Sequence, residues 1–248
     1  MKIDFYYFSH QCPLNHEMLQ LLNGYRDRME IHIHDISQDR ETARRMHLFF
    51  PTLTLLDGKR RYYAPLNQAF LDQAARETYP HEAPYLPALS QVPVRKTVLP
   101  IRLDNLETAC GCCGRKTAGG CAKKGEFLGT FRQRIYGFMH LDENGTLLGG
   151  AEYLPAELVP YPIPHDGDTA FITCVYMSDP AFDYKSAPLN ALENHLKGQY
   201  AKVIAISDEA GVFPNGNLEF FIRNGYKDEG ILFEDPNYCR LHLVSKAL

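Results

Sequence analysis

The sequence lacks three features that would assign it to common classes of protein. It has no apolar run that approaches the length of a bilayer-spanning helix. Its first residues, MKIDFYYFSHQC, contain Asp4 and His10 and therefore lack the uninterrupted apolar core of a signal peptide. The formal net charge is -4, so no overall positive field favours nucleic acid or anionic lipid. We expect a cytoplasmic protein that binds neither nucleic acid nor membranes.

Internal repeats are also lacking, and the composition is that of a globular protein. With 248 residues, 45% hydrophobic and 23% charged, the chain is long enough for one large core or two modest ones. Prolines recur between Tyr79 and Val94 with few periodic apolar positions, as expected of an extended connection that cannot continue a helix. We therefore predict a domain at 1–80, a proline-rich linker at 81–94 and a second domain at 95–248.

The first domain is predicted to have the element order β-α-β-α-β-β-α, complete by about residue 78. Cys12-Pro13 lies where the first strand gives way to the first helix, and the field of a helix N-terminus favours an exposed thiolate there. Pro51 opens a later strand that runs into an Asp-Gly turn.

These features resemble the thioredoxin superfamily over roughly the first third of the chain. The resemblance implies a thioredoxin-like fold with a redox site at Cys12. Asn15 stands where the family usually has its second cysteine, so Cys12 is at best a monothiol site. The alternative is a fold that is retained only as an interaction module.

The second domain is predicted to contain a strand, a helix, a hairpin around an Asn144-Gly145 turn, a strand, a loop and a helix. A continuous apolar run at 202–207 then indicates a strand covered on both faces. A short helix that ends at Gly225 and two last strands complete the chain.

This order resembles the GNAT N-acetyltransferase superfamily over residues 95–248. The best local match is NLEFFIRNGYK, from Asn217 to Lys227. The chain is also similar to bacterial proteins that fuse a thioredoxin-like segment to such a domain, in which the phrase AEYLPAE follows the hairpin turn. We predict an α/β fold class with α+β mixed sheets, in which a thioredoxin-like domain precedes a GNAT acyl-CoA N-acyltransferase-like domain.

The GNAT resemblance implies acetyl-CoA as the acetyl donor and a small-molecule amine as the acceptor. The strand at 174–177 would hydrogen-bond the pantetheine arm, and a backbone N–H near Val175 or Tyr176 would polarise the thioester carbonyl. The helix at 187–200 would face the pyrophosphate with its N-terminus. The cofactor-binding residues implied are Cys174, Val175, Met177, Tyr184, Lys185, Ser186, Asn217 and Phe221.

The predicted phosphate loop departs from the family pattern. It reads SDPAFDYKSAPLN and contains no glycine, although phosphates approach bare backbone most closely. Pro188 removes one amide donor from the first helical turn, and Asp183 adds a repelling charge. Lys185 and Ser186 replace part of the lost donor set. The alternative is therefore a retained fold whose cofactor site has been lost.

Candidate catalytic groups come from the hairpin and the strand after it. Glu152 is our first candidate for the general base and Glu157 the second, because both flank the strand that would border the acceptor amine. Tyr176 is a candidate for protonating the departing thiolate. Carboxylates at strand ends are more often solvated surface residues, which is the competing interpretation.

Seven cysteines in a chain without an export signal are expected to stay reduced. Cys110, Cys112, Cys113 and Cys121 lie within a glycine-rich segment, and four thiolates suffice for zinc or an iron–sulfur cluster. Their spacing is not a standard one, so redox sensing and simple burial stay open.

A second functional hypothesis therefore stands beside the acetyltransferase. It is a non-catalytic metal-binding or thiol-redox-responsive protein that uses Cys12 and the four clustered cysteines. Cys174 and Cys239 are predicted to be buried small hydrophobic residues. A homodimer is left open.

Overall fold

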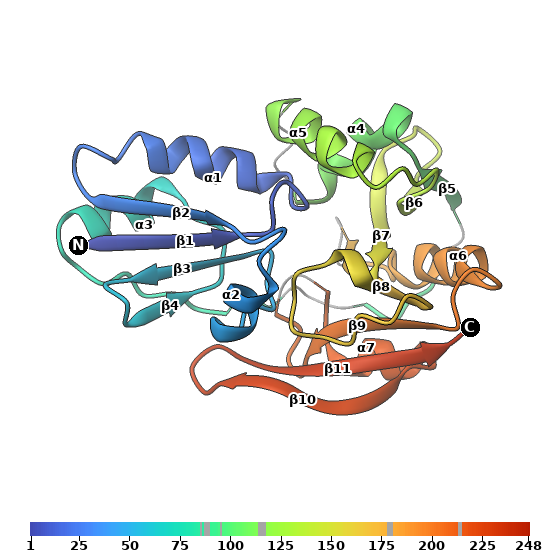
Figure 1. The fold of residues 1–248 in the computed structure, drawn as a ribbon. Coiled ribbons are helices and arrows are strands. Elements are labelled where there is room, and N and C mark those ends of the chain that lie inside the picture. The colour runs from blue at the N-terminus through green and yellow to red at the C-terminus, as the bar shows by residue number, and fades with distance from the viewer. Residues whose placement is uncertain (85, 87–89, 95, 114–117, 178–180, 213–214) are drawn as a thin grey trace. The chain divides into compact units, whose positions relative to one another are not determined.

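The computed structural model describes residues 1–84, 86, 90–94, 96–113, 118–177, 181–212 and 215–248, without the side chains of 112, 113 and 118. The chain forms two compact units (Figure 1). The first unit comprises Met1–Ala83, Thr117–Thr130 and Pro160–Pro162, and the second comprises Pro84–Lys116, Phe131–Val159 and Ile163–Leu248. The predicted linker at 81–94 spans the first passage between them, and the chain returns to the first unit twice.

The first unit contains a four-stranded sheet in the order β2-β1-β3-β4. Strand β1 pairs in parallel with β2 and antiparallel with β3. The predicted element order is confirmed as far as α3, while the assignment to the thioredoxin superfamily stays a prediction. The elements are β1 (Lys2–Tyr7), α1 (Leu14–Asn23), β2 (Glu30–Asp35), α2 (Arg40–Arg45), β3 (Thr52–Leu56), β4 (Arg60–Tyr62), α3 (Gln68–Ala75) and, later in the chain, α5 (Ala118–Gly129).

Local sequence explains these elements. Leu14, Met18 and Leu22 recur at helical spacing and are buried along one face of α1. Asp57 and Gly58 both have positive φ, at 50° and 67°, which is the geometry of the tight hairpin turn that joins β3 to β4. Helix α5 packs against α1 within this unit.

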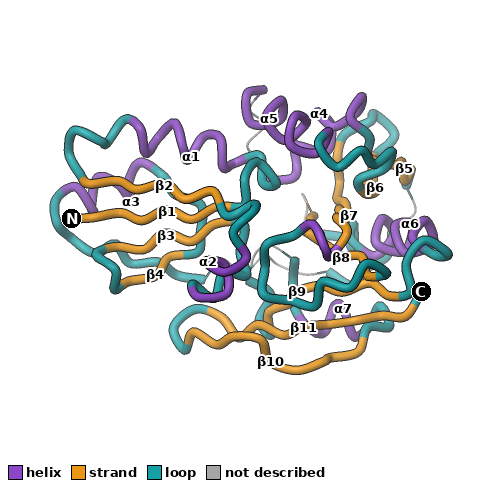
Figure 2. The backbone as a smooth tube through the Cα atoms, viewed as in Figure 1, coloured by secondary structure: helices purple, strands orange, loops and turns teal. Residues whose placement is uncertain are grey.

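The second unit is built on a seven-stranded sheet in the order β10-β11-β9-β8-β7-β6-β5 (Figure 2). Neighbouring strands are antiparallel except for β8 and β9, which are parallel. The strands are β5 (Thr97–Ile101), β6 (Gly137–Leu141), β7 (Leu147–Pro155), β8 (Thr169–Met177), β9 (Lys202–Asp208), β10 (Lys227–Asp235) and β11 (Cys239–Ala247). The helices are η1 (Leu103–Asn105), α4 (Leu106–Ala109), η2 (Cys110–Cys113), η3 (Ala156–Leu158), α6 (Ser186–Leu196) and α7 (Leu218–Arg223).

The two faces of this sheet are covered by different elements. Helices α6 and α7 share one face, where Leu189, Leu192 and Phe221 pack against apolar residues of β7, β8 and β9. Helix α4 and η2 both contact β7, and η2 also contacts β8. The chain is thus a mixed α/β protein with two mixed sheets.

Among the described residues, no helix is both long and apolar enough to cross a membrane.

Candidate functional site

The parallel strands β8 and β9 diverge halfway along their length. Their paired residues run from Thr169 opposite Lys202 to Ile172 opposite Ala205, yet β8 continues to Met177 and β9 to Asp208. A β-bulge at this point, between the pairs Tyr153–Ile172 and Glu152–Cys174, bends β8 away from its neighbour. The divergence leaves backbone groups of both strands facing a gap.

The side chain of Asn215 bridges this gap. The Val175 N–H of β8 donates to Oδ1 of Asn215 at 3.1 Å, and Nδ2 of Asn215 donates to the Ile206 carbonyl of β9 at 2.8 Å. Asn215 is only 2% exposed, so neither bond competes with bulk water. One carboxamide thus satisfies a donor on one strand and an acceptor on the other, as buried backbone groups require.

Lys185 and Ser207 hold the turn that carries Asn215. The Lys185 ammonium donates to the Asn215 carbonyl at 3.3 Å, and the Ser207 hydroxyl donates to the Gly216 carbonyl at 3.0 Å. Gly216 has φ +111°, and a Cβ there would overlap Nζ of Lys185. The positive φ favours glycine here, and any larger residue would require the Lys185 ammonium to shift.

Lys185 is itself unusual, because it is a cation that is only 4% exposed. Burial lowers its pKa to about 8, against the opposing field of the Asp183 carboxylate. Its ammonium lies 4.6 Å from the centre of the Phe220 ring, a contact that favours the charged form. At neutral pH this side chain is therefore mostly a buried cation beside the gap.

The N-terminus of α6 is capped by a carboxylate of the chain. Oδ1 of Asp183 accepts from the Lys185 N–H at 3.1 Å and the Ser186 N–H at 3.0 Å, while Oδ2 accepts from the Ser186 hydroxyl at 2.7 Å. Arg223 lies 3.9 Å from the same carboxylate. The carboxylate predicted to repel a phosphate also occupies two N–H groups at the start of the helix that a phosphate would use.

A cavity of about 170 Å³ lies beside this helix N-terminus. Its wall brings together two cationic side chains, Lys185 and Arg223, and two carboxylate residues, Asp183 and Glu219. The segment predicted as the linker also contributes Ser90 and Gln91, and its Val92 carbonyl accepts a backbone bond from the Asp183 N–H at 2.8 Å. The lining residues are Ser90, Gln91, Asp183, Lys185, Asn217, Glu219, Phe220 and Arg223.

The other residues implied for cofactor binding fall into different environments. Asn217 caps α7, because its Oδ1 accepts from the Phe220 N–H at 3.0 Å. Phe221 is fully buried in the core beneath α6. Tyr184 is buried, and its carbonyl lies 3.4 Å from Nδ1 of His140. Met177 pairs with Gly149 of β7 at the last rung of the ladder.

Glu152, Cys174 and Tyr176 share the sheet face opposite α6. Glu152 pairs directly with Cys174, whereas the adjacent pair of Ala151 and Val175 contributes to the α6 core. Glu152 is 3% exposed, and Tyr176 is also buried. The first candidate base therefore lies inside the protein, beside the strand that borders the gap, and is not a solvated surface carboxylate.

Glu157 lies elsewhere. It is exposed in η3, just beyond the rung where Pro155 pairs with Ala170 at the start of β8. The gap opens toward Met177, at the other end of β8. Glu157 is therefore separated from the gap by the length of the paired strands.

Two expectations about the cysteines are corrected. Cys110 and Cys121 are disulfide-bonded, not reduced, so in this state neither supplies a thiolate to a metal. The side chains of Cys112 and Cys113 lie outside the described residues. Within the part of the chain that the structure describes, no group of three or more metal-ligating side chains is brought together.

Cys12 lies just before α1 with a free thiol, but it is 6% exposed rather than open to solvent. The expected exposure of its sulfur is therefore wrong. Cys174 and Cys239 are buried, as predicted.

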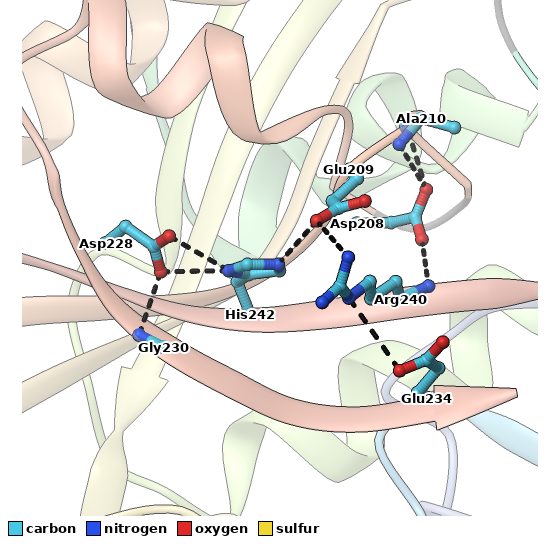
Figure 3. A network of polar contacts seen from close by, with 9 residues as sticks. Asp208, Glu209, Ala210, Asp228, Gly230, Glu234, Arg240 and His242 are labelled. Carbon is cyan, nitrogen blue, oxygen red and sulfur yellow. Dashed lines mark hydrogen bonds and ion pairs between the residues drawn. The ribbon is translucent and has the colours of Figure 1, made fainter.

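A polar network that the sequence did not indicate links β10 and β11 to the residue that follows β9 (Figure 3). Nδ1 of His242 lies 3.0 Å from both Asp228 oxygens, and its Nε2 lies 3.2 Å from Glu209. Arg240 bridges Glu209 and Glu234 at 3.4 and 3.8 Å.

Next to this network, a cavity of about 300 Å³ is lined by four carboxylate residues. Two of them, Glu209 and Glu234, are paired with Arg240. Asp208 accepts backbone bonds from Ala210, Gly211, Val212 and Arg240, and Asp235 accepts one from Asn237. These carboxylates are engaged within the fold, so the network stabilises this end of the sheet.

No protein-family model matches the chain, and no curated protein matches it. Solved structures of acetyltransferases are similar to it over about 60% of its length. A GNAT superfamily phosphinothricin acetyltransferase from Sinorhizobium meliloti in complex with AcCoA is 14% identical; the match covers 62% of this chain and 89% of that chain, with a TM-score of 0.45. A GNAT family acetyltransferase from Bacillus cereus is 13% identical, covering 62% and 98%, with a TM-score of 0.43. A mutant spermidine N-acetyltransferase from Vibrio cholerae is 11% identical, covering 61% and 92%, with a TM-score of 0.43.

Proposed function

We propose that the second unit binds acetyl-CoA and transfers its acetyl group to a small-molecule amine. The observation that carries this proposal is the divergence of β8 from β9 beyond Ile172 and Ala205. It sets the Val175 N–H and the Ile206 carbonyl across one gap, with the N-terminus of α6 nearby. A donor and an acceptor placed in this way fit the amide groups of a pantetheine arm.

The charged residues beside the gap fit the rest of such a ligand. Lys185 and Arg223 line one cavity and are the side chains proposed to contact phosphate oxygens, in a lining that also holds the carboxylates of Asp183 and Glu219. Ser186 adds a hydroxyl at the first turn of α6. In the structure, Asp183 occupies N–H groups at the start of α6, and Asn215 occupies the gap. Both side chains must therefore move for the ligand to bind.

Acetyl-CoA supplies an activated acyl group when bound. Glu152 is the residue proposed to accept a proton from the amine as its nitrogen bonds to the acyl carbon and the carbon–sulfur bond breaks. The buried position of Glu152 beside Cys174 supports this role. Tyr176, on the same face, is proposed to return a proton to the sulfur.

Calorimetric titration of the full chain with acetyl-CoA tests the binding step. The absence of binding up to millimolar concentration would overturn the proposal. Transfer is tested by thiol release in the presence of a panel of small amines. We expect Glu152→Gln to bind acetyl-CoA but lose at least about a hundredfold in transfer rate, whereas the exposed Glu157→Gln keeps both. Equal rates for the two variants would remove Glu152 from the reaction.

A thiol-redox role is the second candidate function, and the disulfide-bonded state of Cys110 and Cys121 favours it over metal binding. We propose that this state changes with the redox conditions. Alkylation and mass spectrometry of native protein, before and after mild reduction, count the accessible thiols. Unchanged acetyl-CoA binding and stability after reduction would show that the disulfide-bonded state of Cys110 and Cys121 has no regulatory role.

A further inference from the structure

The Asn215 side chain fills the gap between β8 and β9 as an external amide would. Its carbonyl oxygen accepts from one strand at 3.1 Å and its NH₂ donates to the other at 2.8 Å. A secondary amide of a ligand offers the same acceptor and the same donor. The two occupants therefore compete for one pair of backbone groups.

We propose that Asn215 is an internal competitor for the ligand gap, and that Lys185 holds it in place until an anionic ligand arrives. The proposal rests on the proposed acetyl-CoA site. It assigns Asn215 a role in deciding how tightly that site binds, in addition to its contribution to the fold.

The geometry of the turn supports this reading. Asn215 is followed by Gly216, whose φ of +111° is one that residues with a side chain rarely adopt. The turn is attached to its surroundings through its carbonyls, one to Lys185 and one to Ser207. A side chain inserted from such a turn can withdraw without breaking the ladder of β8 with β7, which is formed separately.

Lys185 links the gap to the neighbouring cavity. Its ammonium contacts the Asn215 carbonyl, and the residue also lines the cavity together with Arg223. A phosphate oxygen in that cavity is a stronger acceptor for an ammonium than a neutral carbonyl is. Binding of an anion would therefore draw the Lys185 ammonium away from Asn215 and weaken the hydrogen bond that keeps Asn215 in the gap.

The test uses the full chain, Asn215→Ala and a matched control, Asn105→Ala. Asn105 also accepts from a backbone N–H, that of Arg102 at 2.8 Å, and donates to a backbone carbonyl, that of Pro100 at 3.0 Å. It does so beside β5, at the opposite side of the sheet from β9. Each variant is titrated calorimetrically with coenzyme A.

We expect Asn215→Ala to bind coenzyme A at least about tenfold more tightly than the wild type, because two bonds no longer have to be broken on binding. Asn105→Ala should bind with wild-type affinity. If the wild type binds coenzyme A and Asn215→Ala binds it equally or more weakly, Asn215 is not a competitor for the gap. That result would leave the proposed function unaffected. Failure of both proteins to bind at millimolar coenzyme A would overturn the proposed function and this inference together.

A second measurement covers the case in which Asn215→Ala does not fold. The side-chain amide signals of Asn215 are followed by ¹⁵N NMR in the wild type as coenzyme A is added. Displacement from the gap should move them toward solvent-exposed values, while those of Asn105 stay in place. Unchanged Asn215 signals at saturating coenzyme A would refute the displacement.

Discussion

The buried Lys185 makes the stability of the second unit depend on pH in a direction opposite to that of an ordinary paired lysine. Its pKa in the folded protein is lowered to about 8, whereas an unfolded lysine keeps its ordinary value of 10.5. The unfolded chain therefore binds more protons between these two values. By linkage, the folded state gains stability as the pH rises from about 8 to 10.5.

The magnitude follows from the same two values. A difference of 2.5 between 10.5 and 8 corresponds to about 3 kcal/mol over the whole range, at about 1.4 kcal/mol for each pKa unit. Between pH 7.5 and pH 10, the free energy of unfolding is expected to increase by about 2 kcal/mol of this total. Because Lys185 is almost fully buried, solvent screening does not reduce the figure much.

The assay is urea unfolding of the wild type and Lys185→Met at the two pH values. We expect the stability of the wild type relative to the variant to rise by about 2 kcal/mol from pH 7.5 to pH 10. Lys202→Met is the control, since a hydrogen bond to Asp166 raises the pKa of Lys202 and the relative stability should change in the opposite direction. A parallel pH dependence for the wild type and Lys185→Met would refute the assignment of Lys185 as a buried, destabilised cation.

Two further predictions concern the turn at Gly216 and the His242 network. Gly216→Ala should lower the free energy of unfolding by about 2 kcal/mol, because the backbone is strained and the added Cβ meets Lys185. Gly198 has φ +78° and open space around it, so Gly198→Ala should lower the stability less in thermal melts. Equal losses in the two variants would show that the contact with Lys185 does not contribute. Burial raises the pKa of Asp228, but hydrogen bonding, to His242 first, outweighs burial, so the pKa in the folded protein lies below 3.8. The contribution of this carboxylate to the free energy of unfolding is therefore present above its unfolded pKa and is lost as the pH falls through its folded pKa. The stability difference between the wild type and Asp228→Asn, measured by urea unfolding, should therefore shrink from pH 6 to pH 3, and a difference that stays constant would contradict the pairing.

Much of the fold could be predicted because its elements have local causes. Asn144-Gly145 predicted the β6–β7 hairpin, and Gly145 indeed has φ +78°. The apolar run of β9 predicted a strand covered on both faces, and consecutive residues from Val203 to Asp208 are indeed buried. The predicted helix after the cysteine-rich segment forms at Ala118–Gly129, but it packs against α1 of the first unit. That packing partner is distant in sequence and leaves no periodic signal.

The polar contacts of the site could not be predicted for the same reason. Asn217 was the asparagine that family resemblance indicated, yet Asn215, two positions earlier, bridges the strands, and Asn217 caps the helix. Both fit the sequence pattern of a turn before a helix, since asparagine favours either setting. Similarly, the sequence indicated Asp183 only as a charge that opposes an anion site, and did not show that it also accepts bonds from the N–H groups of Lys185 and Ser186.

The placement of Asp183 and Asn215 follows from a general requirement on buried backbone groups. Two strands that diverge inside a protein expose a donor and an acceptor, and the first turn of a helix exposes further donors, all of which cost free energy if left unpaired. In this chain, Asn215 pairs with the Val175 N–H and the Ile206 carbonyl, and Asp183 pairs with the N–H groups of Lys185 and Ser186. A ligand that uses the same groups gains only the difference between its own bonds and the bonds it replaces. Its affinity therefore depends on additional interactions, and the buried Lys185, which contacts Asn215 and lines the adjacent cavity, is placed to supply one of them.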